Sequence, residues 1–228
     1  MQRQIFLDTE TTGLRAEDGD RVIEIGCVEL FDRRPTGKNF HFYLNPERES
    51  HPDALRVHGL TSAFLADKPK FSAIAQDFLA YIAGAHILIH NAPFDLGFLN
   101  AELQRLGLPA MAAHMHSVED TLVLAKQLYP GQHNSLDALC RRLGVDNTGR
   151  SLHGALLDAQ LLADVYIGMT RGQNSLLADG GTSSVQTPGL RQDLSALQLA
   201  VLPASAEELA AHAALLADIG NKAQVIWA

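Results

Sequence analysis

The sequence predicts an α/β fold in which a mixed five-stranded sheet is flanked by helices and followed by a tethered C-terminal segment. Three short strand-like segments open the chain, and strand and helix patterns then alternate up to Arg171. Antiparallel strands need only turns between them, whereas parallel strands need a crossover that is usually helical. Beyond Arg171 the composition shifts to Gly, Ser, Thr and Gln, which is typical of a linker.

The first three strands are predicted from β-branched and apolar patterns separated by turn residues. They cover residues 5–7, 21–30 and 39–44, with turns around Gly19-Asp20 and Pro35-Thr36-Gly37. We expect these three strands to be antiparallel. A fourth strand is expected at residues 86–91, where helical patterns begin to alternate with strands.

Four helices are predicted from apolar residues at helical spacing, at residues 71–84, 93–108, 134–144 and 154–172. Pro93 is suited to a first helical turn, and either Asn134 or Ser135 can cap the third helix. Gly107 and Gly144 are placed to end their helices.

The chain is predicted to comprise a domain at residues 1–171, a flexible linker at 172–204 and a C-terminal segment at 205–228. Ser205 and Glu208 form a capping-box pattern ahead of an amphipathic helix. The segment is too short for a core of its own, so we expect it to pack on another protein.

Composition restricts the class of protein. Of the 228 residues, 46% are hydrophobic, which is enough for a packed core. No apolar run approaches the roughly 20 residues of a membrane span, and the N-terminus lacks the apolar stretch of a signal peptide. Cys27 and Cys140 lie in apolar patterns typical of reduced core residues, although two cysteines could form a disulfide. We therefore expect a cytoplasmic protein with no membrane partner.

The formal net charge is −8. Proteins that bind nucleic acid on their own usually carry a basic face, because contacts to phosphates supply most of the non-specific affinity. An acidic chain that acts on nucleic acid would need metal ions at its site, a partner that holds the polymer, or both.

Asp8 and Glu10 stand in the stretch LDTETTG at the end of the first strand. Side chains two residues apart on a strand point to the same face, so these carboxylates should be neighbours. Like charges repel, and burying an unpaired one is costly. By itself the pair fits either a solvated strand end or a site that binds a cation.

Two further stretches place polar residues beside apolar elements. HNAPFD puts Asp95 in the first turn of a helix that follows a strand. HGALLDA puts His153 just before a helix and Asp158 about one turn inside it, with apolar residues on both sides. Such a position is unfavourable for a carboxylate that is merely solvated.

DTETTG, HNAPFD and HGALLDA, in this order, resemble the three motifs of the DEDDh 3′–5′ exonucleases, whose fold is RNase H-like. IEIGCVEL, RVHGLT and SLHGALLDAQLLADVY resemble the members that serve as proofreading subunits of bacterial replicative DNA polymerases. The resemblance is strong over residues 3–172 and weaker at the C-terminal end. It implies an exodeoxyribonuclease that removes mispaired 3′-terminal nucleotides as nucleoside 5′-monophosphates.

The resemblance also implies two divalent cations, Mg²⁺ or Mn²⁺. Asp8, Glu10 and Asp158 would bind the metals directly, with Asp8 bridging both, and Asp95 would hold the second metal. His153 would take the proton from the attacking water, because imidazole titrates near neutrality. Hard cations prefer oxygen ligands, and two of them can activate water and stabilise the leaving oxygen of a phosphodiester.

The residues expected to bind substrate are Asp8, Glu10, Asp53, His58, Asn91 and Asp158. His58 matches a family residue that contacts the terminal nucleotide. Asp53 stands where related subunits usually carry Glu and is one methylene shorter. Asn91 would help to place the phosphate or sugar, and His90 would orient the turn that carries Asp95.

The tail suggests protein partners. Gln173, Leu176 and Leu177 resemble a short motif that contacts the sliding clamp, and Leu215, Ile219 and Trp227 resemble a segment that docks on the polymerase subunit. A small accessory (theta-like) subunit is a further expected partner, and single-stranded or frayed 3′ DNA ends are the expected substrate.

Two other readings remain open. One is a stand-alone DEDDh nuclease that trims RNA or small oligonucleotides. The other is a subunit whose main task is to stabilise the polymerase–clamp assembly, a role that is compatible with catalysis.

Overall fold

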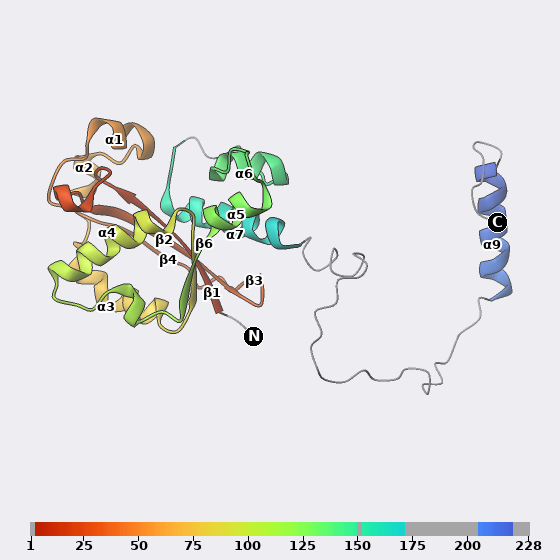
Figure 1. Cartoon of the computed structure of the whole chain (residues 1–228), viewed down its shortest axis with the longest axis horizontal. Coiled ribbons are helices and arrows are strands. Elements are labelled where there is room, and N and C mark those ends of the chain that lie inside the picture. Colours follow the sequence, from red (N-terminus) through yellow and green to blue (C-terminus); the bar gives the residue numbers. More distant parts are fainter. Residues whose placement is uncertain (1–2, 150–151, 172–204, 221–228) are drawn as a thin grey trace. The chain divides into compact units, whose positions relative to one another are not determined.

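The computed structural model describes residues 3–149, 152–171 and 205–220 (Figure 1). The chain divides into two units, Met1–Gly180 and Gly181–Ala228. The division falls within the predicted linker of residues 172–204, which lies outside the described residues, so the predicted domain boundaries stay predictions. None of the helices in the described residues has the length and hydropathy that a membrane span requires.

The first unit contains a six-stranded mixed sheet. Its strands are β1 (Arg3–Thr11), β2 (Val22–Phe31), β3 (Arg34–Pro35), β4 (Phe40–Tyr43), β5 (His86–Ile89) and β6 (Ser117–Asp120). The order is β3-β2-β1-β5-β6, and β4 also pairs with β2. β2 is antiparallel to β1, β3 and β4, whereas β5 runs parallel to both β1 and β6.

The predicted fold class is confirmed, with antiparallel strands first and parallel strands after them. The sheet has six strands rather than five because the two-residue β3 pairs with the end of β2. Four of the five expected strands were located in the sequence, and neither β3 nor β6 was predicted. The first is only two residues long, and the second, SVED, contains a single apolar residue.

The helices of this unit are α1 (Pro52–His58), α2 (Ser62–Leu65), α3 (Phe71–Ile82), α4 (Ala92–Arg105), α5 (Thr121–Leu128), α6 (Leu136–Leu143) and α7 (Ala155–Arg171). Two short 3₁₀ turns lie at Ala16–Asp18 and Met111–Ala113. Ser135 caps α6 by accepting a hydrogen bond from the Ala138 N–H (3.3 Å), and Gly144 ends this helix with a left-handed φ of 68°.

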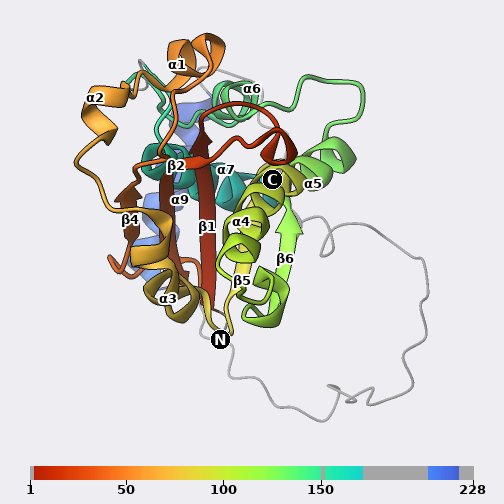
Figure 2. The same cartoon turned by 90° about the vertical axis from the view of Figure 1, so that its left-hand side faces the viewer.

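The helices cover both faces of the sheet (Figure 2). On β1, Ile5 and Leu7 point into a core shared with α3 and α4, whereas Phe6 points into a second core shared with α7. This alternation follows the period-two geometry of a strand. It means that Asp8 and Glu10, which share the parity of Phe6, lie on the α7 face of the sheet.

The described part of the second unit is the helix α9 (Ala206–Gly220). It begins with the predicted capping box, in which the Ser205 N–H donates to Glu208 Oε2 (2.8 Å) and the Glu208 N–H donates to Ser205 Oγ (3.2 Å). Leu209 and Leu215 are each 58% exposed on this helix.

Candidate active site

A cavity of about 250 Å³ brings the predicted catalytic residues together. The residues that line it come from β1, the end of β5, the first turns of α4 and α6, and the start of α7. They are Asp8, Thr9, Glu10, His90, Phe94, Asp95, Ser135, Leu136, Asp137, His153 and Asp158. Residues that are up to 150 positions apart in the sequence therefore meet at one end of the sheet.

β1 carries Asp8 and Glu10 to this cavity, and Gly26 allows α7 to reach it. Gly26 lies opposite Asp8 on the neighbouring strand β2. A Cβ atom at Gly26 would lie 2.2 Å from the backbone carbon of Ala155, so only glycine permits this approach. The first turn of α7 therefore sits directly against the sheet and brings Asp158 beside the two carboxylates of β1.

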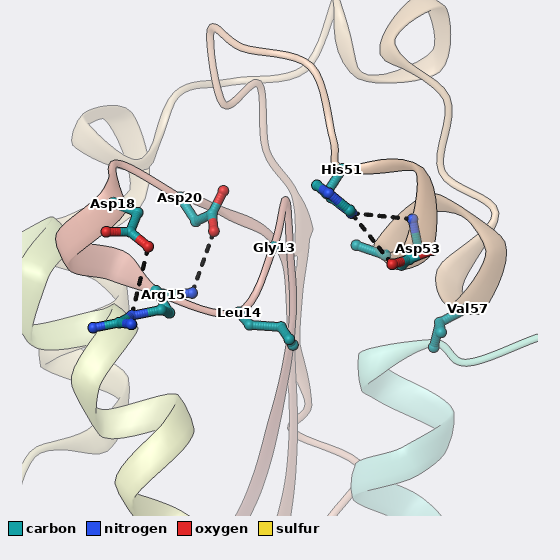
Figure 3. A pocket seen from close by; sticks show the side chains of 9 residues that line it. Gly13, Leu14, Arg15, Asp18, Asp20, His51, Asp53 and Val57 are labelled. Atoms are coloured by element: carbon teal, nitrogen blue, oxygen red, sulfur yellow. Dashed lines mark hydrogen bonds and ion pairs between the residues drawn. The ribbon is translucent and has the colours of Figure 1, made fainter.

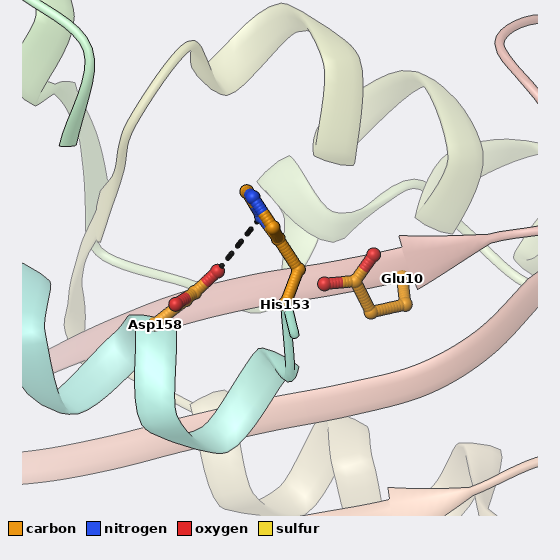
Figure 4. A group of neighbouring side chains, drawn as sticks. All are labelled: Glu10, His153 and Asp158. Carbon is orange, nitrogen blue, oxygen red and sulfur yellow. Dashed lines mark ion pairs between the residues drawn. The ribbon is translucent and has the colours of Figure 1, made fainter. Parts of the chain in front are cut away.

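Glu10, His153 and Asp158 form the tightest part of the site (Figure 4). One ligand atom from each of the three side chains lies within 4.8 Å of the other two. His153 Nδ1 is 3.4 Å from Asp158 Oδ2, and the His153 side chain is 44% exposed whereas that of Asp158 is only 4% exposed. The backbone N–H of His153 donates a hydrogen bond to the Val57 carbonyl oxygen (3.1 Å), which connects the loop before α7 to α1.

Asp95 enters the cavity from the first turn of α4 and is almost fully buried. Thr9 Oγ1 donates a hydrogen bond to Asp95 Oδ1 (2.7 Å). Burial raises the pKa of the Asp95 carboxyl to about 7, because desolvation disfavours its charged form. Thr9 was not predicted as a site residue. It lies between the two acids of β1, so its side chain points to the other face of the sheet, toward α4.

The donor set of this cavity fits hard divalent cations. Asp8, Glu10, Asp95 and Asp158 supply carboxylate oxygens, and three of these residues are less than 10% exposed. Carboxylates that share a buried cavity repel one another, and a bound cation relieves the repulsion. Oxygen donors with an open side toward solvent are suited to Mg²⁺ or Mn²⁺, which keep several non-protein ligands.

His58 lies at the end of α1 and is 3% exposed. Its Nδ1 accepts a hydrogen bond from the Leu60 N–H (2.9 Å), while its Nε2 is buried without a hydrogen-bond partner among the described residues. Burial lowers the pKa of His58, which favours the neutral imidazole. It does not line the carboxylate cavity.

Asp53 lines a second cavity, of about 300 Å³, between the loop after β1 and α1 (Figure 3). Leu14 and Val57 are the exposed apolar side chains of this cavity. The Asp53 side chain is 69% exposed and forms an ion pair with Arg56. Asn91, whose backbone is in the left-handed conformation just before α4, is also exposed. The structure therefore does not place Asp53 or Asn91 in the carboxylate cavity.

His90 lines the cavity and precedes the turn that carries Asp95. Its Nδ1 lies 3.0 Å from Thr121 Oγ1 and its Nε2 lies 2.9 Å from the Asn134 carbonyl oxygen. His90 thus connects the end of β5 with α5 and with the loop before α6, the helix whose first turn lines the cavity.

The expected partner-binding residues are mostly outside the described residues. Gln173, Leu176, Leu177 and Trp227 lie there, and so does the side chain of Ile219. Leu215 is described and exposed on α9.

Comparison with known proteins identifies the family. An exonuclease family model matches residues 5–166. The chain is 49% identical over 235 residues to the DNA polymerase III subunit epsilon of Pasteurella multocida, covering 99% of this chain and 93% of that protein. It is 47% identical over 229 residues to the subunit epsilon of Escherichia coli, with coverage of 96% and 94%.

Solved structures agree with this fold. Exonuclease X in complex with 5′ overhanging duplex DNA superposes with a TM-score of 0.55 at 28% identity, covering 80% of this chain and 95% of that one. Apo exonuclease I superposes with a TM-score of 0.65 at 20% identity, covering 78% and 44%. The RNase H-like fold is therefore confirmed, and the chain belongs to the exonuclease family, among the DNA polymerase III epsilon subunits.

Proposed function

We propose that this chain is the proofreading 3′–5′ exodeoxyribonuclease subunit of a DNA polymerase III. The observation that carries the proposal is the convergence of four carboxylates and His153 on one cavity. The identity of 47–49% to subunits of this name, over nearly the whole chain, supports the assignment.

Two divalent cations, Mg²⁺ or Mn²⁺, would be held by Asp8, Glu10, Asp95 and Asp158. When bound, such a pair supplies charge that activates water and stabilises the leaving oxygen of the phosphodiester. The oxygen-rich donor set and its burial support this part of the proposal.

His153 is the proposed general base. It lies on the loop before α7, is partly exposed to solvent, and has its Nδ1 3.4 Å from Asp158 Oδ2. An imidazole can accept the proton of the attacking water near neutral pH. The Asp158 carboxylate would orient the ring and stabilise the imidazolium that forms, while the reaction releases a nucleoside 5′-monophosphate.

The second cavity, beside α1, is proposed to hold part of the terminal nucleotide. Its apolar residues Leu14 and Val57 can contact a base. His58 follows Val57 on α1, and because its Nδ1 accepts from the Leu60 N–H, the buried Nε2 of the neutral ring carries the proton and would donate to the substrate. A mispaired end costs less to unpair than a matched one, so a site that accepts only a single strand acts preferentially on mispaired ends. Asp53, which lines this cavity, and Asn91, just before α4, are also proposed to contact the substrate.

The proposed partners are the alpha (polymerase) subunit, the sliding clamp and a small theta-like subunit, in the bacterial cytoplasm. The net charge of −8 supports delivery of this chain to DNA by partners rather than by its own affinity. Gln173, Leu176 and Leu177 are proposed to contact the clamp, and the apolar residues Leu215, Ile219 and Trp227 to contact the polymerase subunit.

The test uses a single-stranded oligodeoxynucleotide labelled at its 3′-terminal phosphodiester, and its RNA counterpart. The wild-type chain should release the terminal nucleoside 5′-monophosphate from DNA in Mg²⁺, and Asp8→Ala/Glu10→Ala should release none while retaining its circular dichroism spectrum. Retained activity in this variant would refute the site. Faster release from RNA, together with no binding to a polymerase subunit, would favour the stand-alone nuclease.

A further inference from the structure

Asp120, at the carboxyl end of β6, connects the N-termini of two helices. Its Oδ1 accepts hydrogen bonds from the N–H groups of Leu122 (2.8 Å) and Val123 (3.3 Å), which cap α5. The same carboxylate accepts from the Asn91 N–H at Oδ1 (3.2 Å) and from the Ala92 N–H at Oδ2 (3.2 Å), at the start of α4. One side chain therefore satisfies backbone donors at the beginning of both helices.

The start of α4 depends on the Asp120 carboxylate because the side chain of its own N-cap residue accepts no hydrogen bond from the helix. Asn91 occupies the N-cap position with φ 73° and ψ 53°, and its side chain makes no capping hydrogen bond. The first N–H groups of any α-helix lack partners within the helix and need acceptors from elsewhere. In α4 that acceptor comes from Asp120, about 28 residues further along the chain.

This connection acts on the turn that carries Asp95. Asp95 lies three residues after Ala92, in the first turn of α4, and projects into the carboxylate cavity. Ile89, the last residue of β5, is paired with Asp120 in the parallel ladder. The end of β6 thus determines where α4 leaves the sheet and where the Asp95 carboxylate lies relative to those of β1.

We infer that Asp120 is a positioning residue for the exonuclease reaction, because it fixes the first turn of α4 and thereby the place of Asp95 in the carboxylate cavity. The inference rests on the proposed role of Asp95 in holding a divalent cation. Asp120 itself is not among the residues that line the cavity, so it acts through α4 rather than on substrate.

Asp120→Ser separates the two functions of this side chain. Serine is a good N-cap residue, so a hydroxyl at this position can still cap α5. A single short hydroxyl cannot reproduce the two-oxygen contact to Asn91 and Ala92. Asp120→Asn is the second variant, since its amide retains only one acceptor oxygen.

Glu29→Gln is the matched control. Glu29 is a buried carboxylate at the opposite end of the sheet, paired in register with Ile5, where it forms an ion pair with Arg3 and accepts a hydrogen bond from Thr36 Oγ1 (2.7 Å). This variant also removes a buried carboxylate, and it should lower the thermal midpoint without disturbing the carboxylate cavity.

The experiment measures Mn²⁺ binding to the full chain by calorimetry without DNA, together with kcat and KM on a single-stranded oligodeoxynucleotide. A displacement of about 1 Å in a catalytic group can cost on the order of 100-fold in rate. Asp120→Ser should therefore weaken Mn²⁺ binding and lower kcat by about tenfold or more, with KM little changed. In an Asp95→Asn background it should cause no further loss, whereas Glu29→Gln should alter neither quantity.

The inference is overturned if Asp120→Ser or Asp120→Asn lowers the thermal midpoint as Glu29→Gln does but leaves Mn²⁺ affinity and kcat within twofold of wild type. It is also overturned if the losses from Asp120→Ser and Asp95→Asn are additive. Absence of metal binding and nuclease activity in the wild-type chain would instead refute the proposed function, so the two failures are distinguishable.

Discussion

Gly26→Ala is predicted to disable the site from a position that does not line it. Gly26 is paired with Asp8 on β1 and with His41 on β4, at the point where the start of α7 meets the sheet. An added Cβ would lie 2.2 Å from Ala155 C and from Leu156 N, both of which are backbone atoms. Because backbone cannot rotate away as a flexible side chain can, the first turn of α7 has to move.

The displacement follows from these distances. Ordinary van der Waals contact begins at 3.4 Å, so the backbone of α7 must retreat by roughly 3.4 − 2.2 = 1.2 Å. A misplacement of about 1 Å in a catalytic group can cost on the order of 100-fold in rate. Overpacking of this kind costs about 1–3 kcal/mol of stability, and each kcal/mol lowers the thermal midpoint of a domain of this size by about 2–4 °C.

The assay compares kcat on a 3′-labelled single-stranded oligonucleotide with the thermal midpoint. Gly97→Ala is the control, because a Cβ at Gly97, within α4, meets no atom within 4 Å and its φ is not positive. That variant should keep its activity and gain up to about 1 kcal/mol from helix propensity. Full activity in a stably folded Gly26→Ala variant would refute the argument that this glycine sets the position of Asp158.

Three further predictions concern buried acids. In metal-free protein, the free energy of unfolding should fall by a few kcal/mol as pH rises from 4 to 7, because folded Asp95, with a pKa near 7, keeps a proton that the unfolded carboxyl (pKa 3.8) has lost. Denaturant unfolding of Asp95→Asn in EDTA should lack this pH dependence, and equal pH slopes in the two proteins would contradict the prediction. Thr9→Val removes the hydrogen bond to Asp95, which should lower the free energy of unfolding by about 1–3 kcal/mol and raise the pKa of Asp95 further. More Mg²⁺ should then be needed for half-maximal activity at pH 7, and an unchanged Mg²⁺ requirement would count against this prediction. Glu102→Gln weakens the pair of hydrogen bonds with Arg21 (2.6 and 2.8 Å) that connects α4 to the start of β2. It should lower the free energy of unfolding, measured in urea, by about 1.5–3 kcal/mol. A loss below about 0.5 kcal/mol, as for an ordinary surface substitution, would show that the contact is unimportant.

Much of the site could be predicted from the sequence because its carboxylates obey local rules. The period of two along β1 was enough to place Asp8 and Glu10 together, and the apolar surroundings of Asp158 marked it as a residue with a special role. Their meeting with Asp95 followed from the resemblance, since no local pattern specifies which strand ends lie side by side.

The supporting contacts were beyond the reach of sequence patterns. β6 has one apolar residue in four, so its pairing with β5 is decided by the rest of the sheet, and the capping of α4 by Asp120 exists only once that pairing forms. Likewise, the hydrogen bond from Thr9 to Asp95 joins residues 86 positions apart. Asp53 was expected to bind substrate from its resemblance to a family position, and it lines the separate cavity beside α1 that is proposed to hold part of the terminal nucleotide.

The thermal midpoint with and without Mn²⁺ tests most directly whether these carboxylates form a metal-binding cavity. A ligand that binds only the folded state stabilises it by about 2.7 kcal/mol at 100 times its dissociation constant. The wild-type midpoint should therefore rise on addition of Mn²⁺ or Mg²⁺. In EDTA, Asp8→Ala/Glu10→Ala should have a higher midpoint than wild type, because two repelling carboxylates are gone, and this midpoint should not rise when metal is added. A wild-type midpoint that is indifferent to both cations would contradict the account.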